Sequence, residues 1–78
     1  MEHNEKTALL QRMLELVENY NILIVVDFTE MGMNPYTFKI HDFNIDEVHE
    51  SDKCYPYYPY ALKAALEQVD ELGIIDFN

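Results

Sequence analysis

The sequence has few of the residues on which several classes of protein depend. Its 78 residues include a single cysteine, Cys54, so no internal disulfide can form and a disulfide-stabilised secreted domain is excluded. Two glycines are too few for a glycine-rich loop that cradles phosphate groups. The longest apolar run, residues 22–26, is far shorter than the ~18 residues that a membrane span needs. Residues 1–6 lack the basic-then-apolar pattern of an export signal, so we expect a cytoplasmic protein.

Basic residues are also scarce. Five lysines and arginines stand against 15 aspartates and glutamates, which gives a formal net charge of −10. This charge argues against direct binding to nucleic acid or to an anionic membrane, because both carry the same sign. Apolar residues, by contrast, are plentiful: 49% of the chain is hydrophobic, enough for the core of one small domain over residues 1–78.

The first predicted helix spans about residues 7–20. Apolar side chains recur there at the i, i+3, i+4 and i+7 positions Leu10, Met13, Leu14 and Val17, and the stripe is widened by Leu9, Leu16 and Tyr20. This stripe is typical of an amphipathic helix that covers an apolar sheet. Thr7 is the expected N-cap, with Asn4 as the alternative, and residues 1–6 are expected to fray.

After this helix the apolar period changes to two. Residues 22–29 and 36–41 are rich in β-branched and aromatic side chains, and a turn containing Gly32 separates them. They predict an antiparallel hairpin over about residues 22–43. Many acidic residues follow, and we interpret residues 44–53 as a solvated acidic loop.

The C-terminal part begins with a tyrosine- and proline-rich segment, residues 54–60, whose prolines favour extended backbone. A second amphipathic helix is predicted over about residues 60–72, with Gly73 as its left-handed C-cap. Its expected buried positions are Leu62, Ala65, Leu66, Val69 and Leu72. In the tail, residues 73–78, the apolar stretch 74–77 either adds a short strand or packs as an apolar end.

These elements predict a small α+β domain of order α-β-β-α. Its antiparallel sheet has two strands, or three if the tail joins it, and two helices pack on it.

The tyrosines are the most suggestive feature for function. Four of them fall within six residues: Tyr55, Tyr57, Tyr58 and Tyr60. Tyrosine is common at protein interfaces, and neighbouring prolines lower the entropy lost on docking. The alternative is that they cover the hairpin and the base of the second helix, and we expect Tyr57 or Tyr60 to enter the core. With the acidic loop, the candidate interaction residues are Tyr55, Tyr57, Tyr58, Asp46, Glu47, Glu50 and Asp52.

Signals for chemistry are weak. Residues 42–46 space oxygen ligands as an EF-hand does, but Glu47 stands where glycine is needed and Lys53 where the closing glutamate is needed, so we reject this motif. A transition-metal site would have to use His41, His49 and Cys54, which lack the close pairing of zinc ligands. The cysteine is expected to be buried and inert. No catalytic residue, cofactor or metal is predicted.

The order of elements resembles that of small bacterial and prophage proteins without an assigned activity. The resemblance rests on the opening helix Leu9-Leu10-Gln11-Arg12-Met13-Leu14, on the step Tyr20-Asn21-Ile22, and on the closing helix Tyr60-Ala61-Leu62-Lys63-Ala64-Ala65-Leu66. It covers most of the chain and implies a fold but no site. Some small acidic phage proteins inhibit host defence, and this analogy is one of size and charge.

Three hypotheses of function follow. The first is a non-enzymatic protein-interaction module, with a homodimer as its simplest form because a hairpin leaves open edges. The second is a phage-type inhibitor whose acidic surface mimics nucleic acid and blocks a host nucleic-acid-binding protein. The third is a small metal-binding protein centred on the two histidines and the cysteine.

Overall fold

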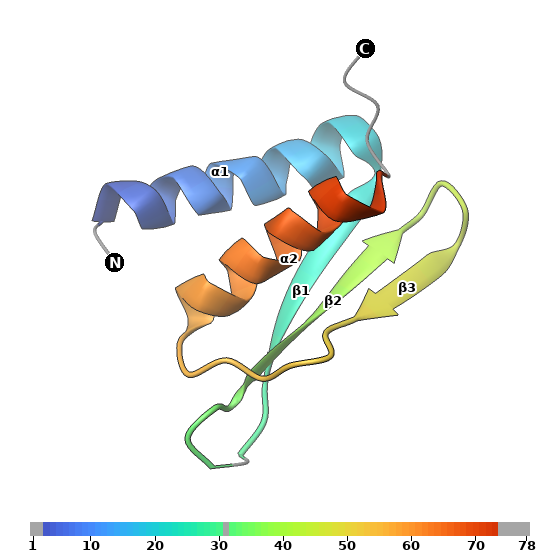
Figure 1. The fold of residues 1–78 in the computed structure, drawn as a ribbon. Helices are drawn as coiled ribbons and strands as arrows, with labels where there is room; N and C mark the ends of the chain where they lie inside the picture. Colours follow the sequence, from blue (N-terminus) through green and yellow to red (C-terminus); the bar gives the residue numbers. More distant parts are fainter. Residues whose placement is uncertain (1–2, 31, 74–78) are drawn as a thin grey trace.

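The computed structural model describes residues 3–30 and 32–73. They form, in order, α1 (His3–Tyr20), β1 (Ile22–Phe28), β2 (Tyr36–Asp42), β3 (Glu47–Glu50) and α2 (Tyr58–Leu72). Figure 1 shows both helices on the same side of the sheet. The molecule measures 39 × 28 × 18 Å, and its thinnest dimension fits one layer of helices on one sheet. The predicted α+β class is therefore confirmed. Within this part of the chain, neither helix has the length and apolarity to cross a membrane.

The sheet is an antiparallel meander with the strand order β1-β2-β3, and the predicted hairpin forms its first two strands. Ile24 lies opposite Ile40, and Ile40 lies opposite His49 on the third strand. Because side chains alternate along a strand, one face carries the buried residues Ile22, Ile24, Phe38 and Ile40. We call this the covered face, because both helices pack on it, and the opposite side the open face.

Strand β3 lies within residues 44–53, where we predicted a loop, so that prediction is wrong. The strand is possible because the connection from β2 is short and held by hydrogen bonds. Asp42 Oδ1 accepts bonds from the backbone N–H of Asn44 and from its side-chain Nδ2, each at 3.0 Å. Asp46 has a φ of 55°, a left-handed conformation that aspartate tolerates in turns. The many acidic residues of this segment indicated exposure to solvent. An edge strand is exposed to solvent as well, so these residues did not distinguish a strand from a loop.

The core lies between the helices and the covered face. Helix α2 packs on β1 and β2, α1 packs on β1 and on α2, and no described helix contacts β3. The residues buried in this core come from α1, β1, β2 and α2. They are Leu16, Ile22, Ile24, Phe38, Ile40, Leu62, Ala65, Leu66 and Val69. The helix-facing side of β3 is left open, and this opening becomes one border of the site described below.

Helix α1 differs from its prediction in its start and in its buried stripe. It already includes His3, so Asn4 and Thr7 lie inside the helix and neither is its N-cap. The core-facing positions are Leu9, Leu10, Met13, Leu16 and Tyr20, all of which belong to the predicted stripe or to its widening, whereas Leu14 of that stripe does not face the core. Leu14 is 52% exposed, because α1 contacts only β1 and α2 and therefore buries a narrow face.

Helix α2 begins at Tyr58, slightly before the predicted start, and Pro59 lies in its first turn. Gly73 has a φ of 65° and ends the helix as the predicted left-handed C-cap. Four of the five predicted buried positions are buried, whereas Leu72 is 42% exposed. The predicted tail strand, residues 74–77, lies outside the described residues.

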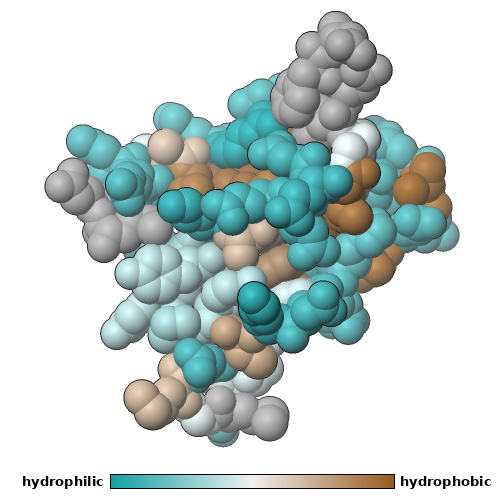
Figure 2. Space-filling view, in the orientation of Figure 1, coloured by the Kyte–Doolittle hydropathy of each residue, from teal (hydrophilic) through white to brown (hydrophobic). Residues whose placement is uncertain are grey.

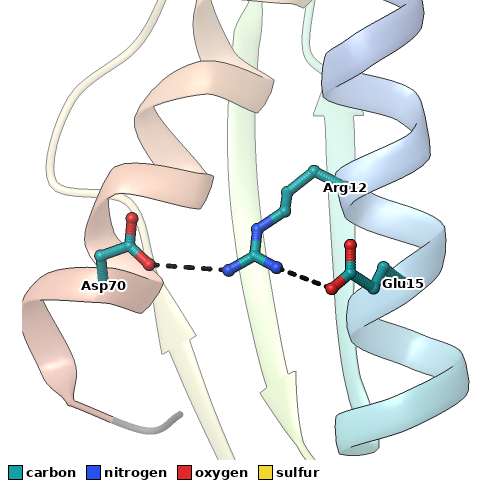
Figure 3. Close-up of polar contacts among 3 residues, drawn as sticks. All are labelled: Arg12, Glu15 and Asp70. Atoms are coloured by element: carbon teal, nitrogen blue, oxygen red, sulfur yellow. Dashed lines mark hydrogen bonds and ion pairs between the residues drawn. The ribbon is translucent and has the colours of Figure 1, made fainter. Parts of the chain in front are cut away.

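An arginine joins the two helices at the surface. Arg12 of α1 places Nη1 3.2 Å from Glu15 Oε1 and Nη2 3.9 Å from Asp70 Oδ1 of α2 (Figure 3). Its guanidinium therefore lies between carboxylates of both helices. This contact offsets part of the repulsion that an acidic chain meets when its helices pack side by side.

Candidate interaction surface

The tyrosine segment is attached to the sheet at Tyr55. Its backbone forms an isolated antiparallel bridge with Tyr36, through hydrogen bonds of 3.0 Å and 2.7 Å. Its ring stacks on Phe38, with the ring centroids 6.1 Å apart. Two backbone hydrogen bonds and a ring contact hold Tyr55 half-buried, so it supports the surface rather than projecting from it.

The chain then turns into α2 and directs its tyrosines to different sides. Tyr57 is the N-cap with extended backbone (φ −136°, ψ 147°), and its carbonyl accepts hydrogen bonds from the N–H groups of Tyr60 and Ala61. Tyr58 turns inward, edge-on to Tyr36 at 6.2 Å. Tyr57 and Tyr60 turn outward and pack against each other with ring centroids 5.6 Å apart.

The expectation that Tyr57 or Tyr60 enters the core is therefore wrong. Their exposures are 63% and 44%. The residues that pack against the core are Tyr55 and Tyr58. A strict alternation along residues 55–60 fails because the backbone passes from extended to helical at residue 58, which changes the side-chain period from 2 to 3.6.

The exposed tyrosine pair borders a shallow hollow. Tyr57, Pro59, Tyr60 and Lys6 line about 340 Å³ of space near the start of α2. We call it the aromatic hollow. In Figure 2 the surface around the start of α2 is only weakly hydrophilic, whereas the rest of the helix layer is mostly strongly hydrophilic.

A second hollow, which we call the acidic hollow, lies between α2 and the segment that follows β3. It encloses about 300 Å³ and its base includes Phe38, Tyr55 and Ala64. Three carboxylates, Asp52, Glu67 and Glu71, line it together with Lys53 and Gln68. Because α2 makes no contact with β3, this hollow stays open to solvent.

Residues from both hollows share one stripe of α2, although the aromatic hollow also borders Lys6 of α1 and the acidic hollow borders the segment after β3. Tyr60, Ala64, Glu67 and Glu71 occupy positions i, i+4, i+7 and i+11, which line up along a helix. The helix thus presents an aromatic end and an acidic end on the same stripe. We call this stripe with its two hollows the α2 surface.

The predicted site residues divide among several places. Asp52 and Tyr55 meet in the acidic hollow, and Tyr57 lies in the aromatic hollow. Glu47 lies on the edge strand β3, with Oε2 3.5 Å from His49 Nε2. Asp46 lies in the β2–β3 turn, and Glu50 belongs to the open face, opposite Lys39. The structure therefore does not gather the acidic residues of the predicted loop into one patch.

The predicted interaction residues did not include Lys6, and from α2 they included only Tyr58. The i, i+4 spacing of Glu67 and Glu71 was the available signal, because such a pair lies on one face of a helix. Lys6 was hidden by the expectation that residues 1–6 fray, whereas α1 extends through it.

The residues considered for metal binding do not share a site. His41 lies opposite Val48 and His49 lies opposite Ile40, so the two imidazoles belong to opposite faces of the sheet. Among the described residues, no group of three or more histidines, cysteines, aspartates or glutamates is placed to hold an ion. Cys54 is exposed, so its predicted burial is wrong.

Comparison of the chain with family models, with curated proteins and with solved structures finds no match in any of the three.

Proposed function

We propose that this protein is a non-enzymatic interaction module that docks a basic segment of a protein partner on the α2 surface. The observation that carries the proposal is the stripe on α2, which aligns the exposed Tyr60 with Glu67 and Glu71. Aromatic anchors beside complementary charge are the usual composition of a protein-binding surface. A partner with an apolar or cationic group for the aromatic hollow and Lys or Arg for the acidic hollow fits both ends.

Two further features support binding rather than catalysis. Both hollows are shallow and open, whereas a catalytic pocket buries most of a small substrate. The rings of Tyr57 and Tyr60 already contact each other, and Pro59 between them restricts the backbone. Such a preformed pair loses little conformational entropy when a partner covers it.

The charge of the chain favours a cationic partner. A net charge of −10 attracts a basic surface from a distance and repels acidic ones. The strength of binding should therefore fall as salt is added, because exposed charges are screened beyond about 8 Å at physiological ionic strength. The contribution of Tyr57 and Tyr60 to binding should remain when salt is added.

The test is affinity capture from the native cells with a panel of baits. Wild type is compared with Tyr57→Ala/Tyr60→Ala and with Glu67→Gln/Glu71→Gln. Glu5→Gln/Glu18→Gln on α1 removes the same charge from exposed residues outside both hollows and is the matched control. We expect the same partner on wild type and control, and at least a tenfold loss on both α2 variants, as about 1.4 kcal/mol of lost contact would give.

Equal capture by all baits would refute the α2 surface as the docking site. The same panel also tests the nucleic-acid mimic: a captured partner that binds nucleic acid and is released by added DNA would support that alternative. Loss of capture with the control bait as well would point to general charge attraction instead of docking.

A further inference from the structure

The open face of the sheet is a surface that the proposed function leaves unexplained. By the strand register it carries Leu23, Val25 and Asp27 of β1, Thr37, Lys39 and His41 of β2, and Val48 and Glu50 of β3. No described helix packs on it, since both helices lie on the covered face (Figure 1).

One end of the open face is apolar. Leu23, His41 and Val48 form one row across the three strands. Phe43, at the start of the β2–β3 turn, stacks on His41 with ring centroids 5.9 Å apart and is 57% exposed. Ile45 at the turn is 59% exposed. In Figure 2, hydrophobic residues gather at the same end of the molecule, where the β2–β3 turn lies.

The other end of the face carries charges of both signs, with one negative charge in excess. Asp27 and Glu50 stand against Lys39, whose Nζ lies 4.0 Å from Asp27 Oδ2 and which lies opposite Glu50 in the register. The face is thus close to neutral on a chain of net charge −10. The excess negative charge belongs to the helices and loops.

We propose that the open face is the interface of a homodimer, in which two copies pack sheet against sheet. A second copy suits this surface because, of all the charged residues of an acidic chain, the face carries only Asp27, Glu50 and Lys39, whereas a basic partner is steered to the α2 surface. Packed sheets lie about 10 Å apart, with each helix layer about 10 Å further out. The two acidic helix layers are then separated by about three Debye lengths and are well screened.

The area of the open face sets the expected strength of the dimer. At ~3.3 Å per residue and ~4.8 Å between strands, the three strands cover roughly 300 Å². A standard interface buries about 800 Å² per partner, so the sheet needs the β2–β3 turn to approach even the lower range. The dimer should therefore be weak and concentration-dependent. It leaves both α2 surfaces outward, so one dimer would present two docking sites to a partner.

Sedimentation of the purified full chain over about 2–200 µM tests this proposal. The critical variant is Val48→Glu and the matched control is Leu14→Glu on α1, because the two side chains are 51% and 52% exposed and gain the same charge. We expect wild type and Leu14→Glu to shift from monomer to dimer as concentration rises. Val48→Glu should raise the dimer Kd at least tenfold, since a two-fold interface contains the substitution twice.

Circular dichroism confirms that each variant folds, and Phe43→Ser in the turn replaces Val48→Glu if that variant does not. A wild-type chain that stays monomeric at about 200 µM would overturn the proposal. So would equal loss of dimer in both variants, or loss in Leu14→Glu alone, which would place the contact on α1. None of these outcomes depends on the α2 surface, so failure here and failure of the docking function are separable.

Discussion

The two faces of the sheet are built from the same strands and differ in what covers them. On β1, Ile22 and Ile24 are 0% and 3% exposed, whereas Leu23 and Val25 between and beside them remain half-buried. A strand that is apolar on both sides is typical of a sheet covered on both faces. Here the described helices cover one face, so Leu23 and Val25 on the other face stay partly accessible in the single chain. The second apolar face of this strand is the observation from which the proposed dimer was argued.

The largest test of this difference compares equivalent truncations on the two faces. Ile40→Ala on the covered face removes a side chain with 0% exposure and should lower the free energy of unfolding by about 3 kcal/mol, through lost burial and a cavity. Val25→Ala on the open face should lower it by less than about 1 kcal/mol. Urea titration at about 1 µM protein, where self-association adds little, measures both values. Equal losses would mean that the two faces do not differ in the monomer.

The next effect concerns the polar end of the covered face. Asp42 is 3% exposed, and its carboxylate accepts two of the hydrogen bonds that Asn44 donates in the β2–β3 turn, while Asn44 Nδ2 also donates to the carbonyl of Tyr20. Asp42→Ala leaves these donors without their acceptor and should reduce stability by about 2 kcal/mol. Asp42→Asn keeps a carbonyl acceptor and should recover part of the loss. The readout is thermal unfolding together with the amide exchange of residues 43–50, and unchanged exchange in the alanine variant would contradict this role of the turn.

Local sequence patterns predicted an element well where the residues of that element alone determine its structure. The β-branched apolar run at the start of residues 22–28, the apolar alternation of residues 36–42, the helix around Leu62 to Val69 and the left-handed Gly73 all follow from neighbouring residues. Strand β3 was missed because its four residues contain three that are charged or titratable, and its pairing depends on the hydrogen bonds of Asp42 to Asn44. On α1, the sequence could not show that Leu16 is buried and Leu14 exposed, because only packing decides which side of a leucine-rich helix meets β1.

The candidate site was predicted in part, for a related reason. Tyrosine content pointed to the correct segment, yet which rings face outward depends on the change from extended to helical backbone at residue 58. The acidic hollow joins Asp52 to Glu67 and Glu71, residues that are distant in sequence. No spacing rule brings such residues together before the register of α2 against the sheet is known.

A smaller effect tests the helix layer on the covered side. Arg12→Met keeps much of the apolar side-chain stem and removes the charge that lies between Glu15 and Asp70. We expect a loss of about 0.5 kcal/mol at low salt that shrinks as salt is added, because the groups are partly exposed. Lys63→Met on α2 removes the same charge from an exposed lysine and is the control. A loss that persists unchanged in high salt would contradict a contribution from the screened charge of Arg12 to the contact between the helices.

The smallest expected change in stability concerns the open face. It is also the most direct test of the difference between the open face and the covered face. Lys39 and Asp27 form a pair at 4.0 Å with side chains 44% and 42% exposed, so water screens their attraction. Lys39→Met should change the unfolding free energy of the monomer by no more than about 0.5 kcal/mol in either direction. Urea titration at about 1 µM protein again provides the measurement. A loss above about 1 kcal/mol would require the ammonium to be desolvated already in the single chain. The open face would then be covered within the monomer, and the contrast with the helix-covered side would disappear.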